Sequence, residues 1–233
     1  MRPTDINDAI PLPRSLLLEG GGKDIYPISS PGLEEAAAAA PQDWGAATAF
    51  ALHRAGARDD PRPVLFVSPR DWRRERGSLS VRGLLGLGIG LDRLIQVRAE
   101  REGEALWAME EALKSGAVAG AVAAAQQPSF VATRRLDFAA REGRAVGVLL
   151  RTGPAGDLSA ARLRWRVAAA PSAPHPFDER SPGALRLTAE LARRRSGPLG
   201  AWELEQDHGT HRLGLAAGLA DHGLVQGRRP HAA

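Results

Sequence analysis

The sequence predicts an α/β fold with a mostly parallel sheet, extended at its C-terminal end by antiparallel strands. Over residues 25–151, short apolar runs alternate with longer segments of helical periodicity, which is the order of elements in a parallel α/β unit. Over residues 160–217, apolar and polar residues alternate with a period of two, typical of strands with one buried and one solvated face. We therefore expect a single domain at 25–220, preceded by a flexible leader at 1–24 and followed by a basic tail at 221–233.

Apolar runs mark the strands expected in the α/β part. The run at 64–67 has four consecutive apolar residues, as expected for a strand that is buried on both faces. Further strands are expected at 25–28, 94–97, 117–123 and 145–150.

Three segments have the pattern of helices, at 44–54, 102–115 and 129–142. In the second of these, Leu106 and Leu113 belong to an apolar stripe at helical spacing, and Gly116 provides a stop. The charged residues 70–80 are expected to form a loop, and the glycine-rich residues 81–90 an irregular segment.

Period-two alternation is clearest at 162–167, 185–191, 202–205 and 211–215. In the first of these segments, Arg162, Arg164 and Arg166 project from one face. Two interpretations are open: these arginines contact the phosphates of a nucleic acid, or they form cross-strand ion pairs with acidic residues. We favour ion pairs, and the expected acidic partners are Glu190, Glu203 and Glu205.

Composition excludes several classes of protein. The 233 residues suffice for one domain with a proper core, and a hydrophobic content of 43% argues against a chain that lacks a stable fold. The absence of cysteine excludes disulfides, thiolate zinc sites and cysteine nucleophiles. Since the chain has neither a run of eighteen apolar residues nor a hydrophobic signal segment near its start, we expect a cytoplasmic protein without membrane contacts.

The basic residues are almost all arginine. Of 31, only Lys23 and Lys114 are lysines, a bias that a GC-rich genome explains. Arginine offers a planar fork for phosphates and carboxylates. The formal net charge of +4 permits contact with nucleic acid without requiring it.

Several motifs resemble those of a known family. Residues 91–98 followed by 104–118 resemble the RecA core, where a helix that ends in a Ser-Gly-Ala-Val-like turn leads into the Walker B strand. The similarity is closer to the ImuA family, RecA-related proteins of bacterial translesion-synthesis cassettes. It is carried by residues 105–116, by Arg-Trp-Arg-Val at 164–167 with the Pro-Ser-Ala-Pro that follows, and by Asp-His-Gly-Thr-His-Arg at 207–212.

This resemblance implies a fold and a function. The fold would be a RecA-like core of the P-loop NTPase type. The function would be that of an adaptor in SOS mutagenesis, bridging an ImuB-like Y-family-related protein and a DnaE-type error-prone polymerase. Two further hypotheses stay open: a module that binds single-stranded DNA or a RecA filament, and a residual nucleotide-binding enzyme. Inhibition of cell division, sometimes attached to related sequences, has no specific support in these residues.

The residues needed for phosphoryl transfer are missing where the resemblance would place them. A P-loop needs glycines, a lysine on the phosphates and a Ser/Thr on magnesium. The corresponding segment has one glycine and no lysine, and its residues are Gln42, Asp43, Trp44, Gly45 and Thr48. The expected Walker B strand ends in alanines, and Ser-Pro-Arg-Asp at 68–71 stands where a catalytic glutamate is expected. We therefore expect no ATPase activity, no bound nucleotide and no metal or other cofactor.

A few side chains are candidates for contacts with partners or DNA. Trp72 lies among arginines, in the kind of setting in which aromatic hot spots occur. A dense basic patch consists of Arg193, Arg194 and Arg195. Near the end of the chain, the candidates are His208, His211 and Arg212. A metal site is one interpretation of the two histidines, but we favour a half-buried structural role for His211, which would share a strand face with Leu213 and Leu215.

Overall fold

The computed structural model describes residues 26–56, 60–153, 158–175, 177–178, 180–195, 197–207 and 209–216. The expected leader, the basic tail and His208 lie outside these ranges. Within them, we find no helix with the length and hydrophobicity that a membrane span requires.

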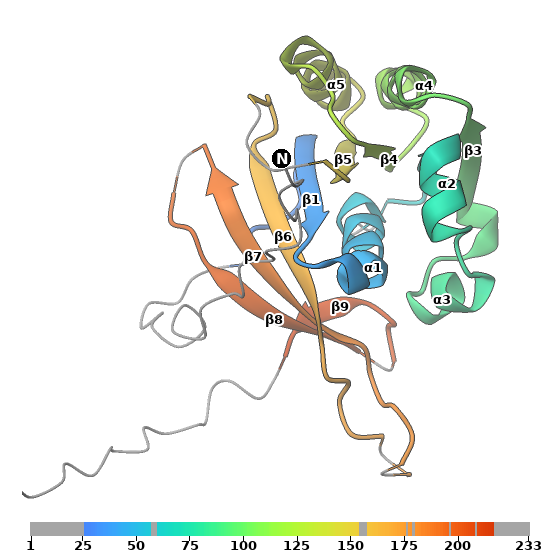
Figure 1. The fold of residues 1–233 in the computed structure, drawn as a ribbon, viewed down its shortest axis with the longest axis vertical. Helices are drawn as coiled ribbons and strands as arrows, with labels where there is room; N and C mark the ends of the chain where they lie inside the picture. Colours follow the sequence, from blue (N-terminus) through green and yellow to red (C-terminus); the bar gives the residue numbers. More distant parts are fainter. Residues whose placement is uncertain are drawn as a thin grey trace, which may run out of the picture.

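A single mixed sheet of nine strands runs through the described part of the chain (Figure 1). The strands are β1 (Gly32–Ala38), β2 (Val64–Pro69), β3 (Leu94–Ala99), β4 (Gly120–Ala125), β5 (Val146–Arg151), β6 (Leu163–Ala170), β7 (Arg186–Arg194), β8 (Ala201–Gln206) and β9 (Leu213–Leu215). Their order is β3-β2-β4-β5-β1-β6-β7-β8-β9. All pairings from β3 to β6 are parallel, and those from β6 to β9 are antiparallel. The predicted α/β fold with its antiparallel extension is confirmed.

Helices cover both faces of the parallel part. They are α1 (Trp44–Gly56), α2 (Arg70–Arg76), α3 (Val81–Gly86), α4 (Glu102–Ser115) and α5 (Phe130–Glu142), with short 3-10 turns at Pro41–Asp43 and Leu91–Arg93. One core cluster contains α1 with Trp72 of α2 and Leu84 of α3, and a second contains α4 and α5 on the opposite face. The helices expected at 44–54, 102–115 and 129–142 are therefore confirmed.

Three predictions about local structure were wrong. Residues 70–80 and 81–90 were expected to be irregular, but they contain α2 and α3, because Trp72 and Leu84 anchor these short helices in the core. The strand expected at 25–28 does not form at 26–28, and the first strand of the sheet is β1.

Strand β1 escaped prediction because it carries two carboxylates in the centre of the sheet. Glu34 is fully buried and pairs with Arg54 of α1 through two hydrogen bonds of 2.6 and 2.9 Å. On the other face of the strand, Glu35 forms ion pairs with Arg151 at 3.0 Å and with Arg164 at 2.9 Å. A buried ion stays charged only when such partners replace its water, so these arginines are a condition for β1 to occupy the centre.

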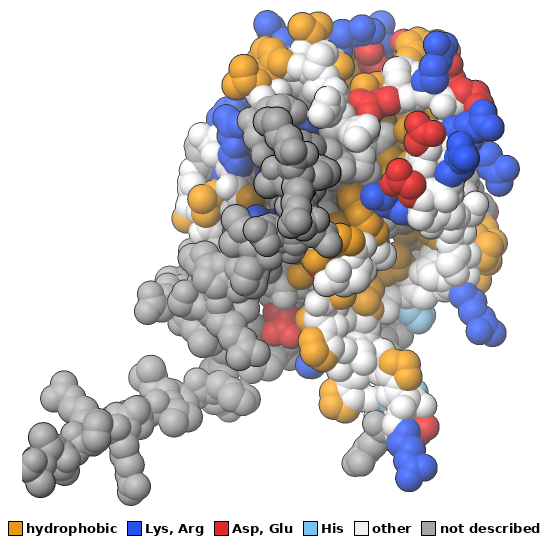
Figure 2. Space-filling view, in the orientation of Figure 1, with side chains coloured by type: hydrophobic (Ala, Val, Ile, Leu, Met, Phe, Trp, Pro, Cys, Tyr) orange, Lys and Arg blue, Asp and Glu red, His pale blue; other side chains and the backbone are white. Residues whose placement is uncertain are grey.

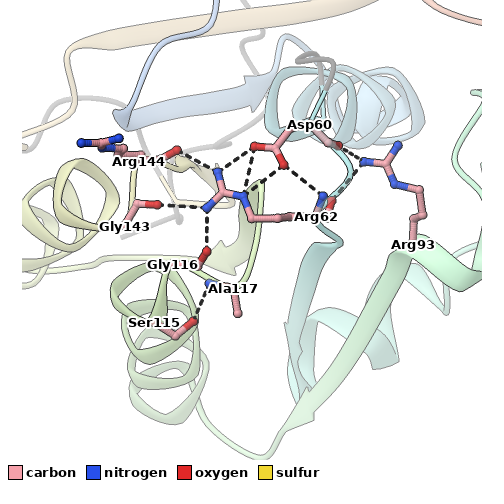
Figure 3. Close-up of polar contacts among 8 residues, drawn as sticks. All are labelled: Asp60, Arg62, Arg93, Ser115, Gly116, Ala117, Gly143 and Arg144. Carbon is pink, nitrogen blue, oxygen red and sulfur yellow. Dashed lines mark hydrogen bonds and ion pairs between the residues drawn. The ribbon is translucent and has the colours of Figure 1, made fainter.

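A polar cluster joins the ends of α4 and α5 to the start of β2 (Figure 3). Arg62 donates to the carbonyl oxygen of Gly116 at 2.7 Å and to those of Gly143 and Arg144 at 3.1 Å each. Asp60 holds the same guanidinium by an ion pair of 2.7 Å. A guanidinium is suited to this place because the last carbonyls of a helix lack partners and carry partial negative charge.

Candidate functional site

The loop between β1 and α1 lies where the resemblance places a phosphate-binding loop. It contains the short turn Pro41–Asp43, and α1 begins at Trp44. Asp43 is 6% exposed, and its carboxylate accepts a hydrogen bond of 2.9 Å from the backbone N–H of Ala169 in β6. The side chain therefore fastens the loop to the sheet, and it puts negative charge where a phosphate would need positive charge.

A pocket of about 440 Å³ opens beside the N-terminal half of α1. Its walls come from α1, from α2, α3 and the loop between them, from Leu185 just before β7 and from the end of β8. Trp44, Gly45 and Thr48, three residues of the segment expected to form the degenerate P-loop, line it together with apolar residues such as Leu52 and Leu84. The structure therefore brings part of the expected site into a hollow that is mainly apolar.

Trp44, Trp72 and Arg76 supply the aromatic rings and the hydrogen-bond donors of this mainly apolar pocket. The Arg76 guanidinium lies over the Trp44 ring at 4.4 Å from its centroid. Trp72 is 8% exposed, and its ring packs edge-on against Phe66 at 5.5 Å. The Trp72 Nε1 and the Arg76 Nε are both buried and have no hydrogen-bond partner among the described residues. Because buried donors are nearly always satisfied, the two unsatisfied donors call for an explanation.

The turn between β8 and β9 borders the pocket. Gln206, a lining residue, donates to the carbonyl oxygens of Gly86 and His211. In the turn itself, the Asp207 carboxylate accepts from the backbone N–H groups of Gly209 at 3.0 Å and Thr210 at 2.6 Å. The motif at 207–212 is thus a side-chain-capped turn that Gln206 connects to the end of α3.

Two named proteins are similar in sequence to most of this chain. Protein ImuA from Caulobacter vibrioides strain NA1000 / CB15N is 38% identical over 222 residues, a match that spans 88% of this chain and 86% of that protein, and the same values hold for strain ATCC 19089 / CIP 103742 / CB 15. The chain belongs to the ImuA family. No family model matches the sequence. Among solved structures, SulA from Pseudomonas aeruginosa is similar with 23% identity and a TM-score of 0.44, over 51% of this chain and 96% of that one.

With the ImuA family established, the motifs that carried the resemblance can be placed in the fold. Residues 105–116 form most of α4 and its glycine stop. The Arg-Trp-Arg-Val motif at 164–167 lies in β6, where the Trp165 Nε1 donates to Glu34 at 3.0 Å. Both motifs are therefore mainly structural, whereas the turn at 207–212 adjoins the pocket.

Two expectations for individual candidates were wrong. Trp72 lies in α2 instead of the expected charged loop and is buried beneath the pocket, while its role as a partner contact stays a prediction. His211 is exposed and precedes β9 with a positive φ of 57°, so it does not share a strand face with Leu213 and Leu215. Among the residues that the structure describes, we find no group of three His, Asp or Glu that could hold a metal ion.

His53 lies in α1, close to the charges of Arg54 and Arg212. Burial, followed by the charges of Arg54 and Arg212, lowers the pKa of His53 to about 4. The imidazole of His53 is consequently neutral at pH 7, and it adds no charge to this side of α1.

The basic patch of Arg193, Arg194 and Arg195 lies away from the pocket. These residues lie at or just beyond the C-terminal end of β7, whereas Leu185 of the pocket precedes its N-terminal end. At about 3.3 Å per residue, roughly 25 Å separates the two ends. Arg193 and Arg195 are exposed, so the patch is available for contacts of its own.

The predicted cross-strand ion pairs are confirmed in one case. Arg166 pairs with Glu190 at 3.8 Å, as expected. Arg164 instead pairs with Glu35, its register partner on the neighbouring strand β1, and Glu205 pairs with Arg186 at 2.6 Å. The pairing of β6 with β7 has a register shift between residues 164 and 165. A simple period-two pattern does not predict such a shift, so it could not predict these partners.

The outer surface of α4 and α5 carries exposed apolar side chains. Trp107, Val131 and Phe138 are 62%, 66% and 71% exposed there. Figure 2 shows hydrophobic side chains among arginines at the end of the molecule formed by these helices. These residues lie off the apolar stripes of their helices, and for Trp107 that position predicts from the sequence either exposure or contact with another element.

Proposed function

We propose that this protein is a non-catalytic accessory factor of error-prone translesion synthesis, acting in the cytoplasm as an adaptor between an ImuB-like protein and a DnaE-type polymerase. Membership of the ImuA family supports a role in damage-inducible mutagenesis. The observation that carries the non-catalytic part is the β1–α1 loop, where the buried Asp43 is bonded to β6 and no lysine is present. Under this proposal the fold is a RecA-type core used as a docking scaffold.

Other positions around the sheet support the absence of ATP hydrolysis. Strand β4 ends at Ala125, and the next side chains are Gln126 and Gln127, so no carboxylate follows it to hold magnesium. Strand β2 ends at Pro69 and leads into α2, whose Asp71 is exposed. Phosphoryl transfer depends on several charges acting together, and a substitute for one of them would not restore the rest.

The test combines binding with turnover. The purified protein is expected to capture the ImuB-like protein and the DnaE-type polymerase encoded in the same organism, and to release no phosphate from magnesium-ATP above the buffer rate. Failure to capture either protein would contradict the adaptor role. Phosphate release that disappears in a Thr48→Ala variant would contradict the non-catalytic role.

A second candidate function is binding of single-stranded DNA or a RecA filament. The exposed Arg193 and Arg195 at the end of β7 favour it. Affinity for labelled single-stranded DNA should then fall steeply with salt, and replacing Arg193–Arg195 with glutamine should reduce the salt slope by up to about three. No binding at low salt would remove this candidate.

A further inference from the structure

We infer that the pocket beside α1 binds an acidic segment of a partner protein, which inserts one large apolar side chain and places a carboxylate against Arg76. The inference rests on the proposed function, since it requires a protein partner. It identifies the surface of the molecule that meets that partner.

The apolar part of the pocket fits a side chain of a polypeptide. Its volume of about 440 Å³ falls within the range of known ligand sites. Leu52, Leu84 and Leu185 contribute to its walls, together with the rings of Trp44 and Trp72. Aromatic and aliphatic walls around a hollow of this size are typical of the central anchor sites of protein interfaces.

The unsatisfied donors indicate an acceptor on the ligand. Trp72 is 92% buried, yet its Nε1 has no partner among the described residues, and the same is true of the Arg76 Nε. A buried indole N–H is usually hydrogen-bonded, so a missing acceptor is a natural explanation. Both atoms have almost no accessible surface, so a carboxylate, which accepts several hydrogen bonds at once, reaches them only when the two side chains rotate toward the pocket.

Charge favours an acidic ligand. Arg76 is the one charged residue among those that line the pocket. Its pairing with Glu75 involves a carboxylate that is 65% exposed, and exposed pairs of this kind contribute little. Residues 70–86, which span α2 and α3, contain five arginines and two acidic residues, and Glu100 pairs with Arg70 and Arg73, which leaves an excess of two positive charges.

A nucleotide suits this pocket less well than a peptide. One arginine and a buried Asp43 nearby offer little to a triphosphate, whereas the leucine walls would leave most of its polar surface unsatisfied. A peptide with one apolar anchor and one carboxylate matches both the walls and the donors.

Two glycines provide matched variants for the test. Gly45 is the second residue of α1 and lines the pocket, and a Cβ added there meets no atom within 4 Å. Gly103 is the second residue of α4 on the opposite face, and a Cβ there is equally free of contacts. Leucine at either position should be tolerated by the helix, but only Gly45→Leu places a side chain at the pocket.

The first measurement uses small probes and the full-length protein. In an NMR titration, 4-phenylbutyrate should shift the indole N–H signal of Trp72, and the neutral 4-phenylbutanol should bind at least fivefold more weakly. Gly45→Leu should abolish binding of 4-phenylbutyrate, Gly103→Leu should preserve it, and Arg76→Gln should remove the preference for the carboxylate. Absence of binding, equal binding of both probes, or unchanged binding in Gly45→Leu would overturn the inference.

The second measurement uses the proposed partners. Gly45→Leu should weaken capture of the partner that occupies the pocket at least tenfold, and Gly103→Leu should stay within twofold of the unchanged protein. If the unchanged protein fails to capture one or both partners, the proposed function fails. If Gly45→Leu captures both as well as the unchanged protein, the adaptor role stands and the assignment of the pocket fails.

Discussion

Replacing Arg62 with alanine should destabilise the fold by uncapping two helices at once. The substitution removes three hydrogen bonds to carbonyl oxygens, at 2.7, 3.1 and 3.1 Å, from the ends of α4 and α5. A net contribution of about 0.5–1.5 kcal/mol for each bond sums to about 1.5–4.5 kcal/mol for the three. Because the Arg62 side chain is 28% exposed, water can replace part of this, and we expect a loss of about 2–3 kcal/mol.

Urea denaturation followed by far-UV circular dichroism measures this loss directly. For a chain of this length, a loss of that size lowers the Tm by roughly 5–10 °C. Arg62→Lys should recover about half of the lost stability, since an ammonium group keeps the charge at the helix ends but not the planar fork. Arg134→Ala, an exposed position on α5, serves as control and should change the free energy of unfolding by less than about 0.5 kcal/mol. A loss below about 1 kcal/mol for Arg62→Ala would refute the capping role.

Three further predictions concern buried groups. Glu34→Gln leaves the Arg54 guanidinium buried without its counter-charge, and should lower the free energy of unfolding by about 3–5 kcal/mol in the same denaturation experiment. Gly143→Ala should be at least as damaging, because a Cβ there would lie 1.7 Å from the Leu113 carbonyl oxygen; a stable, unchanged variant would contradict the close helix contact. The pKa of His53 is lowered from 6.5 to about 4, so the unfolded chain binds this proton first as pH falls. The corresponding stability, at most about 3 kcal/mol, is present above pH 6.5 and lost between pH 6.5 and 4, and His53→Gln should flatten that part of the pH profile.

Local patterns were sufficient to predict much of the fold. The helix at 102–115 was predicted at both ends, because its apolar stripe and Gly116 stop are local signals. The antiparallel strands followed from their period of two. By contrast, β1 depends on arginines distant in sequence, since Glu35 and Arg151 are 116 positions apart, and its carboxylates conceal its place in the core.

The site was predicted only in part, because it is assembled from distant segments. The sequence analysis singled out Trp44, Gly45 and Thr48 because their segment lacks the residues of a phosphate-binding loop. The structure places these three residues in the wall of a mainly apolar pocket. The contribution of Gln206 depends on the sheet order, which no local pattern of residues specifies. Trp72 lies among arginines in the sequence, which suggests a solvated segment. Its side chain faces inward because residues 70–76 form the short helix α2, with Trp72 on the buried side.

The most direct test of the central claim is capture of the ImuB-like protein and the DnaE-type polymerase with all nucleotide removed by apyrase. If this ImuA-family protein works through surface recognition, both partners are retained to the same extent with apyrase as with magnesium-ATP. Capture that requires ATP, or that is lost when a non-hydrolysable analogue replaces it, would show that nucleotide chemistry is part of the function.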